Sequence, residues 1–276
     1  MTDERQSADP DVPNTHPEAP SFPDPSAPVP PQAPPATVER SAREPFWSYM
    51  DLALFAGLAV PSMVVGVILV RIATWLLHLN LKPKALELLP AQFIGYGLLF
   101  AALYAIFRTQ YSRPFWDSLG WRPMSLPAAK IVLTGATVSV AVALGSMLLG
   151  TPDTSNPMKE MLSDPVSMLL IGIFGTTLGP LCEELVFRGF LQPLLVRSFG
   201  AAAGVLGAAV PFGLLHLQQY GFSWRHALLI TFAGAAFGWM RHITDSTRAS
   251  TLMHASYNGL FFLALLVQRR AFPHTW

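Results

Sequence analysis

The chain has 276 residues, of which 51% are hydrophobic and 13% charged, with a formal net charge of +1. Ordinary soluble domains carry about 25% charged residues, so this composition excludes most soluble classes and favours an integral membrane protein. The near-neutral charge gives no basis for a nucleic-acid partner, and Cys182 as the single cysteine excludes a disulfide within the chain.

The N-terminal segment 1–45 differs in kind from the rest. It holds nearly half of the 25 prolines and has almost no aliphatic run. Such a segment buries too little apolar surface to offset its ordering entropy, so we predict a disordered tail with polyproline II character. It lacks the basic start and apolar stretch of a signal peptide. A PxxP-type partner site is conceivable here, but an inert tail is the favoured interpretation.

The remainder, 46–276, is predicted to be a transmembrane domain. A membrane-spanning helix needs about 20 apolar residues, and stretches of this kind recur along the chain. The stretch 227–240 is short enough to be a span or a re-entrant segment. The sequence therefore predicts six or seven spans, at 52–70, 88–107, 131–149, 166–181, 201–217, 227–240 and 252–267, of which the fourth begins at 166–181 and runs on into a charged segment.

The loop after the second stretch carries Arg108, Arg113, Arg122 and Lys130, whereas the next loop is richer in acids. Because Lys and Arg concentrate in cytoplasmic loops, we expect this loop and the N-terminal tail to be cytoplasmic. We expect the protein to reside in the plasma (inner) membrane, with the lipid bilayer as its surroundings.

Glu183, Glu184 and Arg188 form the first cluster of ionisable residues within the apolar stretches. A charge at the centre of a membrane costs roughly 2.5–3.5 kcal/mol on insertion scales, so such residues pair, line a cavity or take part in chemistry. Glu184 and Arg188 share a helix face and can pair, whereas Glu183 points about 100° away. Pro180 predicts a kink just before them. One glutamate is then free to activate water, although a structural salt bridge is the alternative.

Two further clusters contain histidine. His216 follows Phe212 at the end of the fifth stretch, where Gly213 allows close approach of another helix. His254 and Asn258 share one face of the last stretch. They can hold a water or orient an oxyanion, or simply bond another helix. A single polar site would explain all three clusters.

Other hydrolytic sites have no support in the sequence. HExxH is absent, as are a GxSx nucleophile segment with a matching histidine and a pair of intramembrane aspartates. Cys182 lacks a context that would activate a thiol. Snorkelling at span ends explains the remaining polar residues, which are Arg71, His78, His226 and His242.

In order, the chain reads EExxxR at Glu183 to Arg188, FxxxH at Phe212 to His216 and HxxxN at His254 to Asn258. This set resembles the CAAX prenyl protease and bacteriocin-processing (CPBP or Abi) family of intramembrane proteases, including type II CAAX prenyl endopeptidases, over about 165–268. The resemblance implies about eight helices around a polar chamber. We therefore expect an all-α, polytopic transmembrane bundle of six to eight spans with a polar intramembrane chamber.

The resemblance also implies roles for individual residues. Glu183 would be the general base, with His216 and His254 around the activated water and Asn258 as oxyanion donor. Glu184 would support the base, and Arg188 would position structure or substrate. Zinc held by Glu183, His216 and His254 is one expectation, and a metal-free glutamate mechanism is the other. The implied substrate is a membrane-associated peptide or protein, of which the prenylated CAAX type is one possibility.

Two other functions remain open. A non-catalytic membrane scaffold or regulator would keep the polar cluster for packing, and a proton-coupled transporter would use it as a relay.

One count along the chain also conflicts with a single site. If the fourth span runs from 166 to 181, Glu183 lies near one membrane face and His216 near the other.

Overall fold

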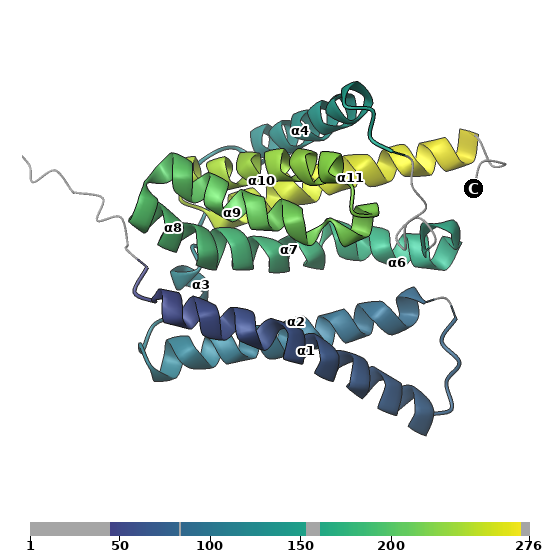
Figure 1. Ribbon diagram of the computed structural model, residues 1–276, viewed down its shortest axis with the longest axis horizontal. Coiled ribbons are helices and arrows are strands. Elements are labelled where there is room, and N and C mark those ends of the chain that lie inside the picture. The colour runs from purple at the N-terminus through teal and green to yellow at the C-terminus, as the bar shows by residue number, and fades with distance from the viewer. Residues whose placement is uncertain (1–44, 83, 153–160, 272–276) are drawn as a thin grey trace, which may run out of the picture. The chain divides into compact units, whose positions relative to one another are not determined.

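The computed structural model describes residues 45–82, 84–152 and 161–271, with the side chains of 269–271 not described. The predicted tail, apart from Pro45, lies outside these residues. Within them, every regular element is a helix (Figure 1), which confirms the predicted all-α class. The elements are α1 (Tyr49–Leu76), α2 (Ala85–Thr109), α3 (Phe115–Ser118), α4 (Ala128–Leu148), α6 (Pro165–Thr176), α7 (Leu178–Glu184), a π-helix (Leu185–Leu191), α8 (Gln192–Phe199), α9 (Ala201–Leu215), a 3₁₀-helix (Gln218–Tyr220), α10 (Trp224–Thr244) and α11 (Thr247–Ala271).

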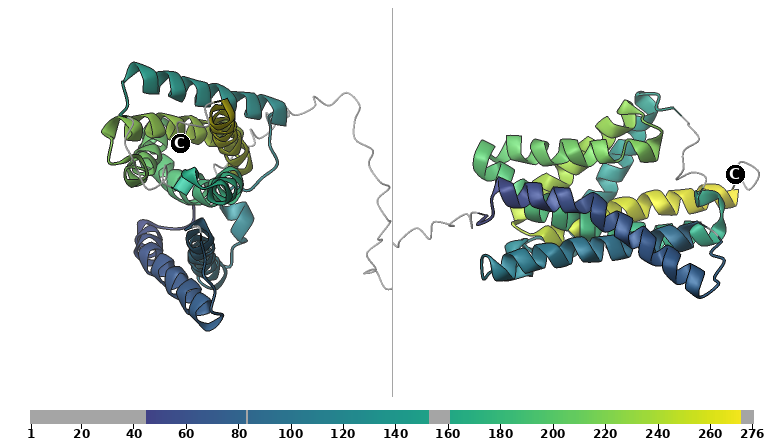
Figure 2. Two further views of the ribbon diagram at one scale, coloured as in Figure 1. Left: turned by 90° about the vertical axis from the view of Figure 1, so that its right-hand side faces the viewer. Right: turned by 60° about the horizontal axis from the view of Figure 1, so that its bottom comes forward.

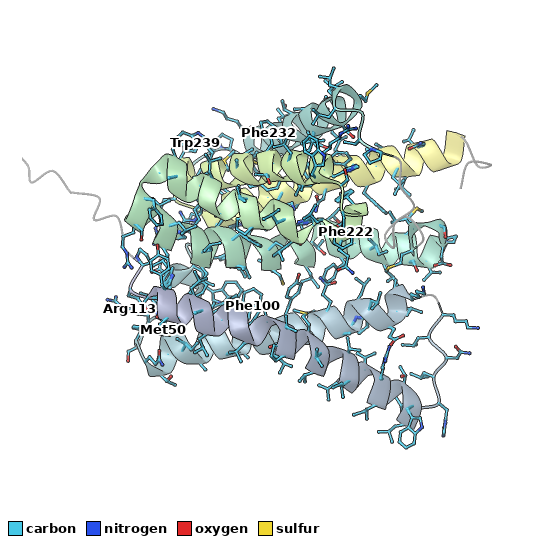
Figure 3. All side chains as sticks on the ribbon, viewed as in Figure 1. Met50, Phe100, Arg113, Phe222, Phe232 and Trp239 are labelled. Atoms are coloured by element: carbon cyan, nitrogen blue, oxygen red, sulfur yellow. The ribbon has the colours of Figure 1, made fainter. Side chains whose placement is uncertain are left out.

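Six of the seven predicted stretches each fall mainly on one helix, and the fourth, 166–181, spans α6 and α7. Five helical segments in the described part of the chain are long and apolar enough to cross a membrane, namely Tyr49–Leu76, Ala85–Thr109, Ala128–Leu148, Pro165–Phe199 and Thr247–Gln268. The apolar helix α9 is shorter, with 15 residues. Large apolar side chains cover the outside, as Phe232 and Trp239 of α10 illustrate at 53% and 51% exposure (Figure 3). Such surfaces suit contact with lipid.

The fourth predicted span is much longer than the sequence indicated. α6 ends at Thr177, whose φ of −128° and ψ of −86° break the helix. Pro180 lies in the first turn of α7, where its missing N–H costs no hydrogen bond, and its ring excludes a continuous helix through Thr176. The predicted kink before the glutamates is thus present. The helix does not stop there, however, and continues to Phe199. The sequence indicated that this span begins at 166–181 and runs on into the charged segment, which agrees with the helix, but it did not give the length of the continuation.

Close backbone contacts join neighbouring helices. A Cβ on Gly213 of α9 would lie 2.6 Å from the Ala227 carbonyl oxygen of α10, which confirms the expected close approach at this glycine. α1 crosses α2 in the same manner where Gly66 faces Ala91 (Figure 2). Small residues at such crossings permit the tight van der Waals packing on which helix association in membranes depends.

An aromatic cluster ties the start of α1 to the π-helix. Trp47 is buried and stacks on Phe107 of α2 and on Phe190, with ring centroids 5.4 Å apart in both pairs. Its indole N–H also donates to the Phe190 carbonyl oxygen at 3.1 Å. The α1–α2 pair is thereby anchored on the segment that follows Glu183 and Glu184.

The start of α11 is fixed by hydrogen bonds to the chain after α3. The Thr247 N–H donates to the Gly120 carbonyl at 2.8 Å, and its hydroxyl donates to the Leu119 carbonyl at 2.6 Å. The buried Arg241 of α10 donates in turn to the Thr247 hydroxyl oxygen at 3.0 Å. These bonds set the position of the helix that carries His254 and Asn258.

Candidate active site

The helices enclose a cavity of about 990 Å³. Four of the predicted site residues lie in its wall, and they come from three separate parts of the chain. These are Glu183 from α7, His216 from the end of α9, and His254 and Asn258 from α11. Glu184 and Arg188 lie directly behind this wall, fully buried. The structure therefore brings all six predicted residues together.

The conflict in depth disappears once the long helix is recognised. α8 and α9 meet at Gly200, whose φ of +80° allows the chain to turn back. Glu183 precedes this turn by 17 residues and His216 follows it by 16. At 1.5 Å per residue, both side chains lie about 25 Å from the turn. Counted from the turn, the two residues reach the same level.

His254 lies between the two glutamates. Its Nδ1 is 3.0 Å from Glu184 Oε1, and its Nε2 is 3.8 Å from Glu183 Oε2. An ionised carboxylate only accepts hydrogen bonds, so Nδ1 carries the proton and Nε2 faces the Glu183 carboxylate. The ring stacks on Phe237 with centroids 4.5 Å apart. The imidazole is therefore held by both a hydrogen bond and a ring contact.

Glu184 is held by Arg188 in the predicted i, i+4 pair. Arg188 Nη1 donates to Glu184 Oε1 at 2.8 Å, and both side chains are 0% exposed. Arg188 Nη2 donates to the Gly234 carbonyl oxygen of α10 at 2.7 Å. The guanidinium also lies 4.5 Å from the centroid of the Phe212 ring. This buried charge thus has a carboxylate, a carbonyl and an aromatic face around it, which are the compensations that burial of a charge requires.

A second hydrogen bond repeats the contact to α10 one turn later. Gln192 Nε2 donates to the Gly238 carbonyl oxygen at 2.9 Å. The two donors, Arg188 and Gln192, are four residues apart, as are the two glycine acceptors. The π-helix and α8 are therefore bonded to α10 at two successive turns.

His216 directs one ring nitrogen to the backbone. Its Nδ1 lies 2.7 Å from the Phe212 carbonyl oxygen. Because a carbonyl only accepts, Nδ1 carries the proton, and in the neutral ring Nε2 keeps its lone pair. The ring packs on Phe212 at 4.7 Å between centroids. His216 thus presents an acceptor nitrogen on a side chain in the cavity wall.

Asn258 bonds the broken helix. Its Nδ2 donates to the Gly175 carbonyl oxygen at 2.6 Å. The break at Thr177 releases that carbonyl from regular helical bonding. An amide has two N–H groups, so one donor remains for another acceptor. The helix–helix bond that the sequence offered as the alternative for Asn258 is therefore present.

Two aromatic residues of the wall were not predicted. Tyr220 and His226 line the cavity and stack on each other with centroids 4.8 Å apart. His226 was expected to snorkel at a span end; it lies in the first turn of α10, and it also lines the cavity. The only signal for Tyr220 in the sequence is its position four residues after His216.

The predicted zinc ligands do not fit a metal site as they stand. Among the described residues, no three His, Cys, Asp or Glu side chains converge as a metal site requires. His254 Nδ1 bonds Glu184, and His254 Nε2 lies 3.8 Å from Glu183 Oε2. That separation exceeds the contact of a shared hydrogen bond but leaves room for an oxygen beside both atoms. We accordingly derive no step through a metal.

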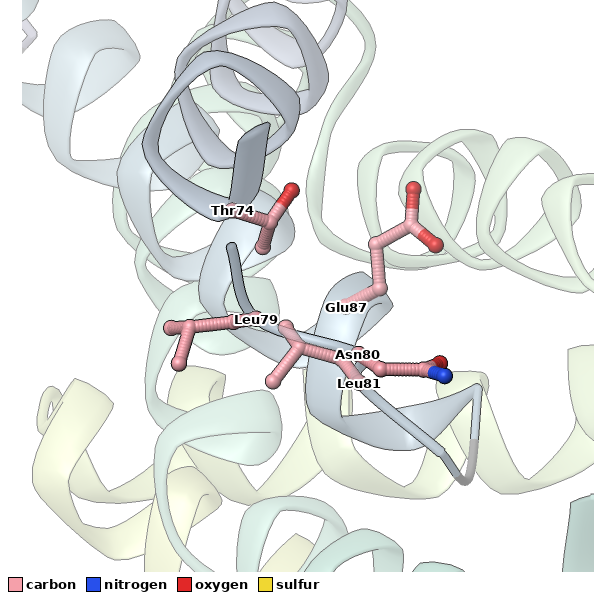
Figure 4. Close-up of a pocket in the computed structure, with 5 residues that line it drawn as sticks. All are labelled: Thr74, Leu79, Asn80, Leu81 and Glu87. Atoms are coloured by element: carbon pink, nitrogen blue, oxygen red, sulfur yellow. The ribbon is translucent and has the colours of Figure 1, made fainter. Parts of the chain in front are cut away.

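A smaller cavity of about 260 Å³ lies between the end of α1 and the start of α2. Figure 4 shows its lining residues, Thr74, Leu79, Asn80, Leu81 and Glu87. Its one carboxylate, Glu87, pairs with Arg71 at 3.0 Å. This cavity shares no residue with the cluster around His254 and is not a candidate for the same chemistry.

Comparison with known families agrees with this geometry. Residues 165–260 match the family model of the Rce1-like type II CAAX prenyl endopeptidases. The matched segment covers about a third of the chain. It contains all six predicted site residues, and the match confirms the resemblance inferred from the three motifs. No curated protein and no solved structure matches the chain. At the level of the family, the Rce1-like match supports a CAAX-type intramembrane protease.

Proposed function

We propose that the protein is an intramembrane endopeptidase that hydrolyses a peptide bond of a membrane-associated substrate of the prenylated CAAX type. The observation that carries this proposal is the position of His254, which is bonded to the buried Glu184 and faces Glu183 in the wall of a large cavity. Such a set of a positioned imidazole and a second carboxylate suits activation of water.

The 3.8 Å between His254 Nε2 and Glu183 Oε2 leaves room for the reacting water. A water oxygen can lie about 2.8 Å from both the nitrogen and the carboxylate oxygen, which is a normal hydrogen-bond distance to each. Its two protons would point to the carboxylate and to the imidazole nitrogen, with a lone pair directed into the cavity. Glu183 takes one proton as the oxygen attacks the peptide carbonyl carbon, and later gives it to the leaving amine.

Glu184 and Arg188 act on the reaction indirectly, through His254. Arg188 neutralises the buried Glu184 carboxylate, and Glu184 fixes the tautomer and angle of His254. A buried acid that orients a histidine in this manner also stabilises positive charge that develops on the ring. Their role is therefore to position His254 rather than to contact substrate.

His216 and Asn258 complete the polar side of the cavity. The remaining N–H of Asn258 is available to the carbonyl oxygen of the scissile peptide, as the resemblance implied. The acceptor nitrogen of His216 is available to an N–H of the leaving amine. Apolar residues cover much of the rest, including Leu88, Ile171, Phe174, Phe261 and Leu265. This lining supports a substrate that carries a lipid chain.

The test uses purified full-length protein in liposomes and a farnesylated CAAX-type peptide with a quenched fluorophore. The unmodified protein is expected to cleave it, and Glu183→Gln and His254→Ala are expected to abolish cleavage while the melting temperature is retained. Glu87→Gln, which changes the pair with Arg71 in the smaller cavity and none of the polar site residues, is the control and should leave turnover intact.

An active Glu183→Gln variant would overturn the mechanism. An inactive but well-folded unmodified protein would favour the scaffold or regulator. Loss of a solute or proton flux in the Glu183 variant, without any peptide product, would favour the transporter.

A further inference from the structure

The turn that follows His216 is built as a rigid unit. The Tyr220 N–H lies 3.3 Å from the His216 carbonyl oxygen and 3.1 Å from that of Leu217. The Phe222 N–H closes the turn by donating to the Leu217 carbonyl at 2.7 Å. Backbone hydrogen bonds thus link Tyr220 directly to His216.

This turn contains an unfavourable backbone conformation. Gly221 and Phe222 have successive φ values of +62° and +60°. Glycine adopts this region readily, but phenylalanine does so only when its surroundings impose it. Strained residues of this kind concentrate at functional sites. The turn that positions the Tyr220 ring therefore contains one strained residue other than glycine, Phe222.

The orientation of that ring is set by α10. Tyr220 stacks on His226 with an interplanar angle of 12°. Both residues line the cavity that contains Glu183 and His254. Within the described residues, the Tyr220 hydroxyl makes no hydrogen bond. An oriented phenol without a partner therefore borders the space where the substrate would bind.

The local electrostatics keep this phenol protonated. Burial, and next the nearby Glu183 carboxylate, raise the pKa of Tyr220. A neutral phenol close to the expected base can donate a hydrogen bond but adds no negative charge. The neighbouring Asn258, in contrast, already donates to Gly175. Among the described wall residues, Asn258 thus has one amide N–H to spare, and the phenolic O–H groups of Tyr220 and Tyr257 also border the cavity.

We propose that Tyr220 is a further catalytic residue, whose hydroxyl donates a hydrogen bond to the carbonyl oxygen of the scissile peptide as that oxygen gains negative charge. This inference rests on the proposed peptidase function and extends it. The water adds to the carbonyl carbon and Glu183 takes the proton, while Tyr220 transfers no proton and only stabilises the oxyanion. Preorganised donors of this kind are worth most where water is excluded.

The experiment compares Tyr220→Phe with the unmodified protein in liposomes on the same quenched peptide. The substitution keeps the ring and its stack on His226 and removes the hydroxyl alone. Loss of one oxyanion donor is expected to lower kcat by a factor on the order of 10²–10³, with KM and melting temperature little changed. Tyr104→Phe is the matched control, because that phenol is 51% exposed on α2.

The outcomes separate the two proposals. An inactive unmodified protein would defeat the peptidase function and this inference with it. An active protein whose Tyr220→Phe variant keeps its kcat would defeat this inference alone. A parallel fall of kcat and melting temperature, or a change confined to KM, would assign Tyr220 to folding or to substrate binding and also contradict the proposal.

Discussion

His254 Nδ1 and Arg188 Nη1 converge on the same oxygen, Glu184 Oε1, at 3.0 Å and 2.8 Å. One buried carboxylate oxygen therefore links the charge-balancing arginine of the π-helix to the histidine of α11. Among the acidic side chains that the structure describes, no other lies so close to either partner. The stability of the bundle and the angle of the imidazole consequently depend on the same atom.

The first prediction concerns this shared carboxylate. Arg188→Met leaves Glu184 as a buried charge without its cation, which should lower the free energy of unfolding by about 3–5 kcal/mol. The double variant Glu184→Gln with Arg188→Met removes both charges and should recover much of that loss. Denaturant titration in mixed micelles measures both effects. A double variant no more stable than the single one would show that the pair is not the source of the loss.

The second prediction concerns Asn258. Asn258→Ala deprives the part-buried Gly175 carbonyl of its donor, and loss of such a hydrogen bond costs about 0.5–1.5 kcal/mol. We expect a corresponding loss of stability together with reduced peptide cleavage. Asn80→Ala, a change of the same type in the exposed loop after α1, is the control. Unchanged stability of the Asn258 variant would mean that water replaces the amide.

The third prediction tests the crossing of α9 and α10. Gly213→Ala forces a methyl group toward Thr231 and the Ala227 carbonyl, and overpacking of this kind costs about 1–3 kcal/mol. Gly97→Ala on α2 meets no atom within 4 Å and should stabilise its helix by up to about 1 kcal/mol. Thermal melts of the two variants should therefore move in opposite directions. Shifts of the same sign would contradict the observed packing.

The fourth prediction concerns metal. Since Glu183, His216 and His254 do not converge as ligands, we expect purified active protein to contain substoichiometric zinc and to keep its turnover in a strong chelator. Elemental analysis and cleavage assays after dialysis provide the two readouts. Stoichiometric zinc, with activity lost on chelation and restored by zinc alone, would show that substrate binding rearranges these side chains into a metal site.

The sequence was most informative about which residues matter and least informative about depth. Apolar runs predicted the helices because membrane helices are recognisable from composition alone. The pair of Glu184 and Arg188 followed from helical spacing. The length of the fourth span could not be predicted, because the charges at 183–188 and the prolines at 180 and 193 are typical of the end of a membrane helix. Only the packing against α10 shows that this polar segment lies inside the bundle.

The wall residues Tyr220 and His226 were beyond sequence reasoning for a different reason. Both flank a turn whose path depends on two successive residues with positive φ. Phenylalanine rarely adopts positive φ, so Phe222 does not predict such a turn. Composition therefore favoured an ordinary span end there. The cytoplasmic tail, the plasma-membrane location and the identity of the substrate remain predictions.

The two bonds from Arg188 to Gly234 and from Gln192 to Gly238 have a mechanical consequence. Helix association in membranes depends on close packing and on hydrogen bonds between helices. A shift of one helix by one residue, about 1.5 Å, would break both bonds at once. It would leave the buried guanidinium of Arg188 without its carbonyl acceptor. The π-helix, α8 and α10 therefore behave as one fixed frame. Entry and exit of a long substrate must be accommodated by helices outside that frame.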